Sequence, residues 1–257
     1  SAYNVPFYTA FWKVVPALMA GDTVILRPNP LTPISSMVFA EAADEAGLPK
    51  GVMNVIVEQA LEGGLAMTTD ERVDMVSFTG SCTVGAKVAE QAAPTLKRLV
   101  LELGGKSAQI YLPDAVGRAA SAAFTVCTSH AGQGCVLGTR VFVPEENKAE
   151  VLEGMAKMLS GVKIGPASDP ATQLGPVISA AQRDRCEHFT QAAVDAGGKV
   201  VCGGKRPEGM DKGYYWEPTV LDLPDNRNPA AQEEIFGPVV GVIGYRDLDH
   251  AVEMAND

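Results

Sequence analysis

Short apolar runs alternate with segments of helical periodicity through the N-terminal part of the chain, and this alternation limits the folds available to it. The runs predict strands at Asp22–Arg27, Val52–Val57, Val73–Phe78 and Arg98–Leu103. Helices are predicted between them, at Ile34–Ala46, Leu61–Thr68 and Thr83–Ala92. Parallel strands need long crossover connections, which are usually helices, so this order predicts a parallel, doubly wound sheet.

The pattern starts afresh after Gly104 and Gly105. Apolar runs predict strands at 108–112, 140–143, 199–202 and 239–245, and helical periodicity predicts helices at 116–129, 149–159, 183–196 and 248–256. A chain of 257 residues is long enough for two domains. The sequence therefore predicts an α/β protein with two lobes, residues 1–103 and residues 104–257.

The charge balance excludes one class of partner. The chain has 31 acidic and 21 basic residues and a formal charge of −10, whereas nucleic-acid binding needs clustered lysine and arginine. No apolar run approaches the ~20 residues that span a bilayer, and the N-terminal residues lack the basic-then-apolar order of a secretion signal. We therefore expect a soluble, cytoplasmic protein whose partners include neither nucleic acid nor a membrane.

Cysteine usage singles out one residue. The chain has five cysteines, with no C-x-x-C spacing, which fits neither a disulfide framework nor a zinc site, so no metal site is expected. Cys135 lies in a predicted loop, Gly132–Gly138, whose glycines allow a ligand to approach closely. It is the best nucleophile candidate. The alternative is an inert, buried thiol, which is the usual state of a free cysteine.

Two phosphate-loop templates nearly match and both fail. Gly80–Lys87 resembles a Walker loop, but Ala86 separates the glycine from the lysine. Gly132–Gly138 has one residue too many for the dinucleotide fingerprint, so neither a P-loop nucleotidase nor an ordinary Rossmann dehydrogenase is favoured. Ser81 is instead predicted to cap a helix whose free N–H groups form an anion site, with a capped turn that binds nothing as the alternative.

Carboxylates occur at two positions of interest. Glu102 ends an apolar strand just before a double glycine, and apolar surroundings would raise its pKa towards that of a working base. An edge-strand glutamate that faces water is the alternative. Glu233 and Glu234 precede an aromatic residue and a turn, and by themselves they are typical of a solvated acidic pair.

Five ordered motifs resemble those of the aldehyde dehydrogenase superfamily, and the resemblance covers the whole chain. The motifs are Asn4–Phe7, Phe78–Ser81, Leu101–Ser107, Gly132–Cys135 and Glu233–Val239. The resemblance implies a parallel open-sheet, Rossmann-like cofactor-binding lobe and an α/β catalytic lobe. A full member is roughly twice as long, so we expect both lobes to be incomplete and the chain to be an internal fragment.

The resemblance also implies the catalytic residues. Cys135 would attack the aldehyde, and the side-chain amide of Asn4 would hold the resulting oxyanion. Glu102 would activate the water that hydrolyses the thioester left after hydride transfer. Lys13 resembles the family lysine in the proton path to that glutamate, and Trp12 would line the substrate tunnel.

The implied cofactor is NAD or NADP. Glu234 matches the residue that holds the nicotinamide ribose, with Phe236 beside it. Arg27 stands where the family usually has a lysine near the adenosine ribose, and Ser81 stands where it contacts the pyrophosphate. The remaining residues of the implied cofactor set lie around the two strand ends, at Gly80, Gly85, Leu103 and Gly104.

Three departures from the family pattern bear on these expectations. Pro30 replaces the glutamate that binds the ribose hydroxyls in many NAD-preferring members, so Arg27 could accept a 2′-phosphate and NADP becomes possible. Glu58–Gly64 replaces the usual Pro-Gly-x-Gly turn and puts the fit of the cofactor there in question. His130 and Ala131 replace the common Asn-Gln before the nucleophile loop.

The expected function is NAD(P)-dependent oxidation of an aldehyde to a carboxylate, in a full-length protein that forms a homo-oligomer. The alternative is a catalytically silent fragment that at most binds nucleotide. A CoA-acylating enzyme is disfavoured because such members usually lack the base that Glu102 supplies. An esterase is disfavoured because the sequence has no G-x-S-x-G motif.

Overall fold

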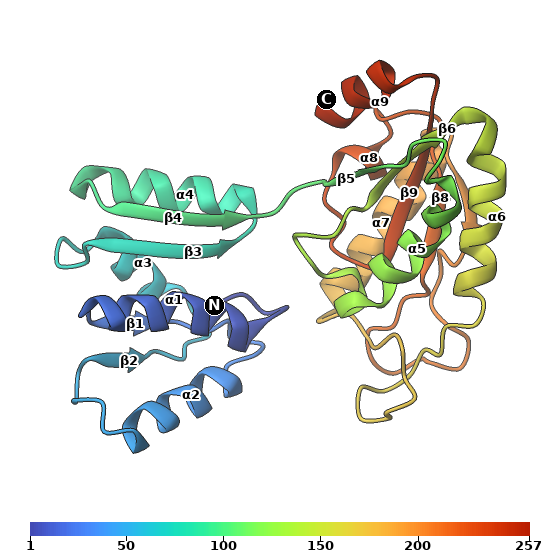
Figure 1. Ribbon diagram of the computed structural model, residues 1–257. Helices are drawn as coiled ribbons and strands as arrows, with labels where there is room; N and C mark the ends of the chain where they lie inside the picture. Colours follow the sequence, from blue (N-terminus) through green and yellow to red (C-terminus); the bar gives the residue numbers. More distant parts are fainter. The chain divides into compact units, whose positions relative to one another are not determined.

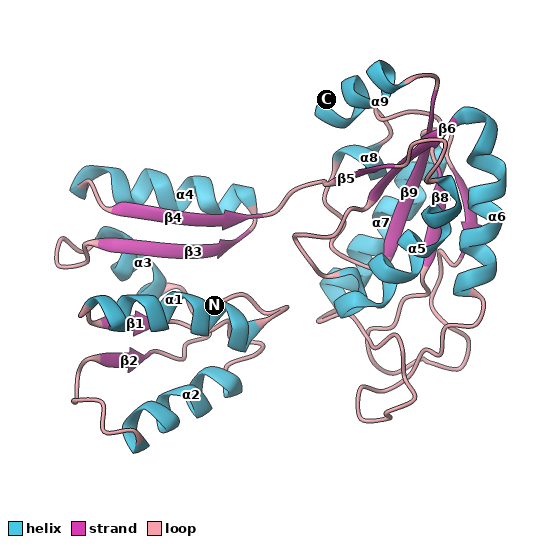
Figure 2. Cartoon of the chain, viewed as in Figure 1, coloured by secondary structure: helices cyan, strands magenta, loops and turns pink.

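Gly104 and Gly105 separate two units of the chain, Ser1–Gly104 and Gly105–Asp257, in a computed structural model that describes residues 1–257 (Figure 1). Each unit combines helices with parallel strands (Figure 2). The predicted α/β class with parallel strand pairing is therefore confirmed. The assignment of cofactor binding to one lobe and catalysis to the other stays a prediction. None of the helices combines the length and low polarity needed to cross a lipid bilayer.

The first unit contains two pairs of parallel strands and four helices. Its strands are β1 (Val24–Leu26), β2 (Met53–Val55), β3 (Met75–Gly80) and β4 (Arg98–Leu103). Its helices are α1 (Pro6–Ala20), α2 (Ile34–Glu45), α3 (Glu62–Thr69) and α4 (Cys82–Ala92). β1 pairs only with β2, and β3 only with β4, so the pairing is parallel as predicted but does not extend over one continuous sheet.

Most of the predicted elements of this unit occur, with shifted ends. β1 and β2 are shorter than predicted, whereas β3 extends to Gly80, two residues beyond its predicted end. The register of the longer pair aligns Thr79 with Glu102 and Gly80 with Leu103. Both strands therefore end together, and the residues that follow them are brought to one edge, where ligands bind in open α/β sheets.

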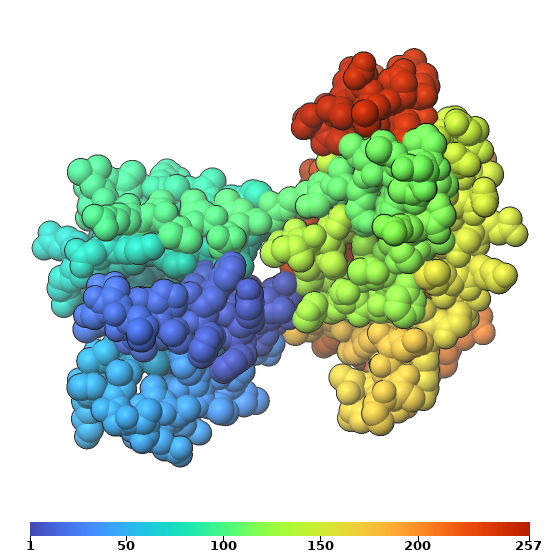
Figure 3. Space-filling model, in the orientation of Figure 1, coloured from blue at the N-terminus to red at the C-terminus, as the bar shows by residue number.

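Helix α1 has no counterpart among the predicted elements. Pro6 at its first turn suits a helix start, because that position needs no N–H donor, but Pro16 lies inside the helix, where proline normally disfavours one. Ala10 and Val14 of α1 are buried against β1. Figure 3 shows this helix, in dark blue, at the surface of its unit. Tertiary packing therefore stabilises a helix that local sequence preference does not indicate.

The second unit is built on a five-stranded sheet with the order β5-β6-β9-β8-β7. The strands are β5 (Ala108–Ile110), β6 (Arg140–Pro144), β7 (Lys199–Cys202), β8 (Thr219–Asp222) and β9 (Val239–Tyr245). The helices are α5 (Ala119–Thr128), α6 (Lys148–Leu159), α7 (Ala180–Asp195), α8 (Pro229–Gln232) and α9 (Leu248–Asn256). All neighbours pair in parallel except β7 and β8, which are antiparallel.

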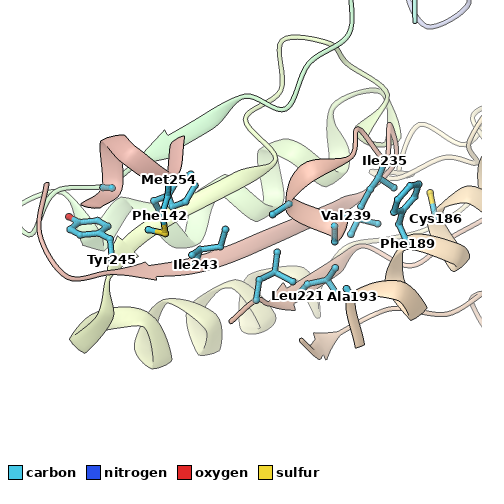
Figure 4. Close-up of a cluster of buried hydrophobic side chains, with 14 of the residues drawn as sticks. Phe142, Cys186, Phe189, Ala193, Leu221, Ile235, Val239, Ile243, Tyr245 and Met254 are labelled. Atoms are coloured by element: carbon cyan, nitrogen blue, oxygen red, sulfur yellow. The ribbon is translucent and has the colours of Figure 1, made fainter. Parts of the chain in front are cut away.

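Alternate residues of the central strands enter two separate cores. Val141 of β6 and Val242 of β9 pack in the cluster that contains α5 and α6. Phe142 and Ile243, the next residue on each strand, pack in the cluster that contains Phe189 of α7 (Figure 4). Successive side chains of a strand point to opposite faces, so helices cover both faces of the sheet. This burial explains the continuous apolar runs of β6 and β9.

Two predictions for the second unit need correction, and one strand was missed. The helix predicted at 116–129 is a short 3₁₀ turn, Val116–Arg118, followed by α5. Helix α7 begins at Ala180 rather than at 183, because the Ser179 side chain accepts a hydrogen bond from the backbone N–H of Gln182 at 3.2 Å. The interior strand β8, between β9 and β7, was not predicted, since its few apolar residues lie between prolines.

Removing part of the Ile243 side chain should destabilise the second unit. Ile243 is fully buried in the cluster that also contains Phe142 and Leu221. Truncation of such a residue to alanine costs about 2–5 kcal/mol. We expect Ile243→Ala to lower the free energy of unfolding by this amount in urea titrations. Val194→Ala, at a position 40% exposed on α7, should change it by less than about 0.5 kcal/mol. Equal effects of both changes would contradict the described core.

Candidate active site

Three polar residues of the first unit come together at the ends of β3 and β4. The ammonium of Lys13, on α1, donates a hydrogen bond to the hydroxyl of Thr79 at 2.6 Å. Thr79 lies opposite Glu102 in the strand register. Burial lowers the pKa of Lys13 to about 8, and the nearby Glu102 carboxylate opposes part of this shift. Lys13 and Glu102 therefore lie close enough to influence each other, and their part in a proton path stays a prediction.

Thr79 is a member of this group that sequence reasoning missed, and Glu102 lies in a different setting from the one predicted. The signal for Thr79 was its position in the Phe78–Ser81 motif. Glu102 is exposed on its strand, because every second residue of β4 is exposed. The predicted apolar surroundings of Glu102 are therefore wrong for the described chain, and the alternative of a water-facing glutamate holds.

The turn between β3 and α4 has the predicted capped geometry. Ser81 is the N-cap of α4, and its hydroxyl accepts a hydrogen bond from the N–H of Val84 at 3.4 Å. A side-chain carbon added to Gly85 would lie 2.6 Å from a methyl group of Leu103. Glycine at this position therefore allows the first turn of α4 to pack closely against β4. The other N–H groups of that turn are not used by the Ser81 side chain, and their binding to a pyrophosphate stays a prediction.

Arg27 is engaged by a carboxylate, contrary to the prediction that it presents its donors to a ligand phosphate. Its Nε donates to Glu58 Oε1 at 2.5 Å, and its Nη2 donates to the carbonyl of Ala60 at 3.0 Å. Glu58 belongs to the segment that replaces the usual glycine-rich turn. Arg27 lowers the pKa of the Glu58 carboxyl, with a further contribution from the N–H of Gly63.

Asn4 and Trp12 lie at the start and on the surface of α1. Asn4 is partly buried and lies two residues before Pro6, the first residue of the helix. Trp12 is 40% exposed, and its ring lies 5.3 Å from that of Tyr8. Phe7 and Phe11, on the same helix, have their rings 5.7 Å apart. The predicted tunnel residue is therefore part of an exposed aromatic surface on this helix.

Cys135 lies in the second unit, on an irregular segment that begins with an unusual turn. His130, Ala131 and Gly132 have consecutive positive φ angles of 51°, 52° and 72°. Only glycine adopts this conformation without cost, and each of the others costs about 1–2 kcal/mol. His130 and Ala131, which replace the family's Asn-Gln, thus both lie in the left-handed region, which histidine adopts more readily than alanine.

A backbone contact joins the nucleophile loop to the predicted ribose-binding segment. A side-chain carbon added to Gly132 would lie 2.0 Å from the carbonyl oxygen of Gly237. No residue with a side chain fits this space unless the backbone moves. The two motifs of this unit, Gly132–Cys135 and Glu233–Val239, are therefore brought together by the absence of a side chain.

Gln133 fixes the same loop from its other side and was missed by the sequence analysis. Its side chain is buried, donates to the carbonyl of His130 at 3.0 Å and accepts from the N–H of Ile178 at 3.0 Å. The signal was its place within the Gly132–Cys135 motif. Cys135 itself is exposed. The structure thus holds the loop rigidly at its start while leaving the thiol accessible.

The other cysteines differ from Cys135 in their surroundings. Burial raises the pKa of Cys127 and of Cys186 to about 12, and it also raises the pKa of Cys202. Thiols in this state are poor nucleophiles, because the thiolate is the reactive form. Cys82 is exposed, and its sulfur lies 3.4 Å from the carbonyl oxygen of Gly104. Cys135 and Cys82 are therefore the two exposed thiols of the chain.

Glu234 and Phe236 belong to a turn whose backbone is held by α7. Gln182 donates to the carbonyls of Ile235 and Phe236 at 2.8 and 2.7 Å, and Arg185 donates to the carbonyl of Glu234 at 2.5 Å. Phe236 has a φ of 59°. This strained conformation persists because the hydrogen bonds to the carbonyls of Glu234, Ile235 and Phe236 hold the turn.

Glu234 and Lys106 influence each other electrostatically. Burial raises the pKa of Glu234, whereas the N–H of Gly105 and the charge of Lys106 act in the opposite direction. Burial also lowers the pKa of Lys106 to about 7, with a contribution from Arg140. Lys106 is a third residue that the sequence analysis did not single out. The lysine charge next to Glu234 favours the ionised carboxylate that can accept hydrogen bonds.

Comparison with known proteins places these motifs in one family. The model of the aldehyde dehydrogenase family matches residues 1–257. A Staphylococcus epidermidis protein named "Putative aldehyde dehydrogenase SERP1729" is 40% identical over 257 residues, which are 99% of this chain and 54% of that protein. The chain thus spans about half the length of the curated relatives that it matches.

Two solved structures show the same fold. An aldehyde dehydrogenase of Mycobacterium tuberculosis, solved with NAD+, matches with a TM-score of 0.95 and 43% identity over 100% of this chain and 53% of its own. A cysteine-to-alanine mutant of aldehyde dehydrogenase C of Pseudomonas syringae, solved with NAD+ and octanal, matches with a TM-score of 0.95 and 40% identity over 99% of this chain and 53% of its own. The chain therefore belongs to the aldehyde dehydrogenase family.

Proposed function

We propose that this chain is part of an oxidoreductase that oxidises an aldehyde to a carboxylate with NAD or NADP. The observation that carries the proposal is the accessible Cys135. Its loop approaches the carbonyl of Gly237, just after Glu234 and Phe236, through Gly132, and is tied to Ile178 by Gln133. The complexes of family members with NAD+ and with octanal support the classes of cofactor and substrate. Homo-oligomer formation and a cytoplasmic location stay predictions.

Cys135 is proposed to be the nucleophile. Its thiolate adds to the aldehyde carbonyl carbon and gives a thiohemiacetal oxyanion. The side-chain amide of Asn4 and the backbone N–H of Cys135 are proposed to donate to that oxyanion. A single donor of this kind typically contributes about 3–4 kcal/mol to the transition state.

Each unit by itself carries groups suited to one part of a dinucleotide. The capped start of α4 offers N–H groups to a pyrophosphate beside Gly80 and Ser81, and the Glu234 carboxylate can accept hydrogen bonds from ribose hydroxyls. The cofactor supplies a hydride acceptor when it is bound. The loss of hydride from the thiohemiacetal carbon leaves Cys135 acylated as a thioester.

Glu102 and Lys13 are proposed to serve the hydrolysis of this thioester. Glu102 is exposed, so water can reach its carboxylate, which takes a proton from the attacking water. Lys13 donates a hydrogen bond to Thr79, and its pKa is lowered to about 8. Near neutral pH it can therefore take the proton from Glu102 and release it to solvent. The products are the carboxylate and the free thiol of Cys135.

The direct test of the proposed function is oxidation of a panel of aliphatic and aromatic aldehydes with NAD and with NADP. In an enzyme whose catalytic segment is this chain, Glu102→Gln should stall the reaction after hydride transfer. We expect a burst of reduced cofactor close to one per active site, followed by slow turnover, because only hydrolysis needs the base. Equal losses in the burst and in the steady state would make Glu102 a structural residue.

Alkylation with iodoacetamide should identify Cys135 as the reactive thiol. We expect its modification, followed by peptide mass spectrometry, to abolish aldehyde oxidation, while Cys127 and Cys186 stay unmodified because burial raises their pKa. Cys82→Ala is the matched control, since Cys82 is the other exposed thiol. Activity that survives in Cys135→Ala, or that is lost in Cys82→Ala, would refute the assignment.

The lowered pKa of Lys13 should appear in the pH dependence of stability. The folded chain releases this proton near pH 8, whereas the unfolded chain holds it to about pH 10.5. The unfolded state binds more protons in that window, so the free energy of unfolding gains a contribution that rises with pH. We expect this rise to be absent in Lys13→Met and present in Lys87→Met, at an exposed position. Urea titrations across the window would show it, and identical pH profiles for both variants would contradict it.

A further inference from the structure

Arg27 and Glu58 lie together where two neighbouring parallel strands end. β1 pairs with β2, with Leu26 opposite Val55. Arg27 directly follows β1, and Glu58 comes shortly after β2. Ligands of open α/β sheets bind outside the carboxyl ends of the strands, and in dinucleotide-binding sheets an acidic residue near such an end accepts the ribose 2′-hydroxyl.

The Glu58 carboxylate accepts hydrogen bonds from a set of N–H donors that would also suit a phosphate. Besides Arg27, it accepts from the N–H groups of Gly63 at 2.8 Å and of Gly64 at 3.0 Å, which belong to the first turn of α3. A side-chain carbon added to Gly63 would lie 2.9 Å from Glu58 Oε2, so glycine permits this close approach. An arginine together with the N–H groups of a helix start is a common phosphate-binding arrangement.

The pair is also shielded from water. The side chains of Arg27 and Glu58 are 21% and 16% exposed. Charges with little solvent around them are screened weakly, so the carboxylate strongly opposes a second anion at the same donors. Pro30, by contrast, is exposed and offers neither a charge nor a side-chain acceptor.

We propose that Glu58 determines the choice of cofactor in this protein. Its carboxylate holds the donors that a 2′-phosphate would need and repels that phosphate, while it can accept a hydrogen bond from the free 2′-hydroxyl of NAD. The chain therefore prefers NAD over NADP even though Pro30 supplies no carboxylate. This inference rests on the proposed function, because it requires that the first unit binds the adenosine end of the cofactor.

Binding of two cofactor halves tests the proposal without any need for turnover. ADP-ribose and 2′-phospho-ADP-ribose are titrated into the 257-residue chain by isothermal calorimetry. The native chain should bind ADP-ribose more tightly. Glu58→Gln keeps an oxygen acceptor for Gly63 and Gly64 but removes the charge, and it should tighten binding of the 2′-phosphorylated ligand about tenfold or more relative to ADP-ribose, which corresponds to about 1.4 kcal/mol.

Two further variants test whether the change in affinity comes from the charge of Glu58 itself rather than from the loss of any nearby negative charge. Glu62→Gln removes an exposed acid from the first turn of the same helix and should leave the ratio of the two affinities unchanged. Arg27→Met combined with Glu58→Gln should lose the gain for the 2′-phosphorylated ligand, because the arginine supplies the fork that holds it.

Two results would overturn the inference in different ways. If the chain binds ADP-ribose but Glu58→Gln leaves the ratio unchanged, Glu58 does not determine the choice of cofactor, and the proposed function stands. If neither ligand binds the native chain or the variants, the cofactor-binding function proposed for this unit fails together with the inference.

Discussion

The close approach of Gly132 to the carbonyl of Gly237 is the constraint on which the rest of the second unit's site depends. It lets a loop that carries an exposed thiol lie against the turn that carries Glu234. Gln133 adds two hydrogen bonds to the loop, one of them to Ile178. Because the loop is anchored at its start and not at Cys135, the thiol is positioned without being buried. A buried thiol would have the raised pKa of the other core cysteines and would react poorly.

Side chains of α7 hold the opposing turn through its backbone rather than through its functional groups. Arg185 and Gln182 donate hydrogen bonds to backbone carbonyl oxygens of the turn. These hydrogen bonds position Glu234 without using its carboxylate oxygens. Lys106 nearby favours its ionised form. The same separation of positioning from function occurs at the capped turn of α4, where Ser81 satisfies one N–H and leaves others for a ligand.

In the first unit, carboxylates lie close to the two cations that belong to the candidate site. Arg27 is paired with Glu58, and Lys13 lies near Glu102, so each cation of interest has a carboxylate partner in its surroundings. Burial of the lysine lowers its pKa into the range in which it can exchange protons near neutral pH. Weak solvation of the Arg27–Glu58 pair gives a single carboxylate a large influence on any anion that approaches. The lowered pKa of Lys13 and the strong influence of Glu58 on anions both arise from partial burial, which weakens the solvation of a charged group.

The sequence by itself determined the strand–helix alternation, the family motifs and the capped turn at Ser81, because these depend on local periodicity and on the spacing of a few residues. Only the tertiary structure decided that α1 forms despite Pro16. It alone decided that Lys13 donates a hydrogen bond to Thr79, and that Arg27 forms an ion pair with Glu58. Those outcomes depend on contacts between residues that are distant in the sequence, and their energies come from packing and from charge pairing that no local pattern records. Local preference thus fixed the elements, and long-range contacts fixed the surroundings in which their side chains act.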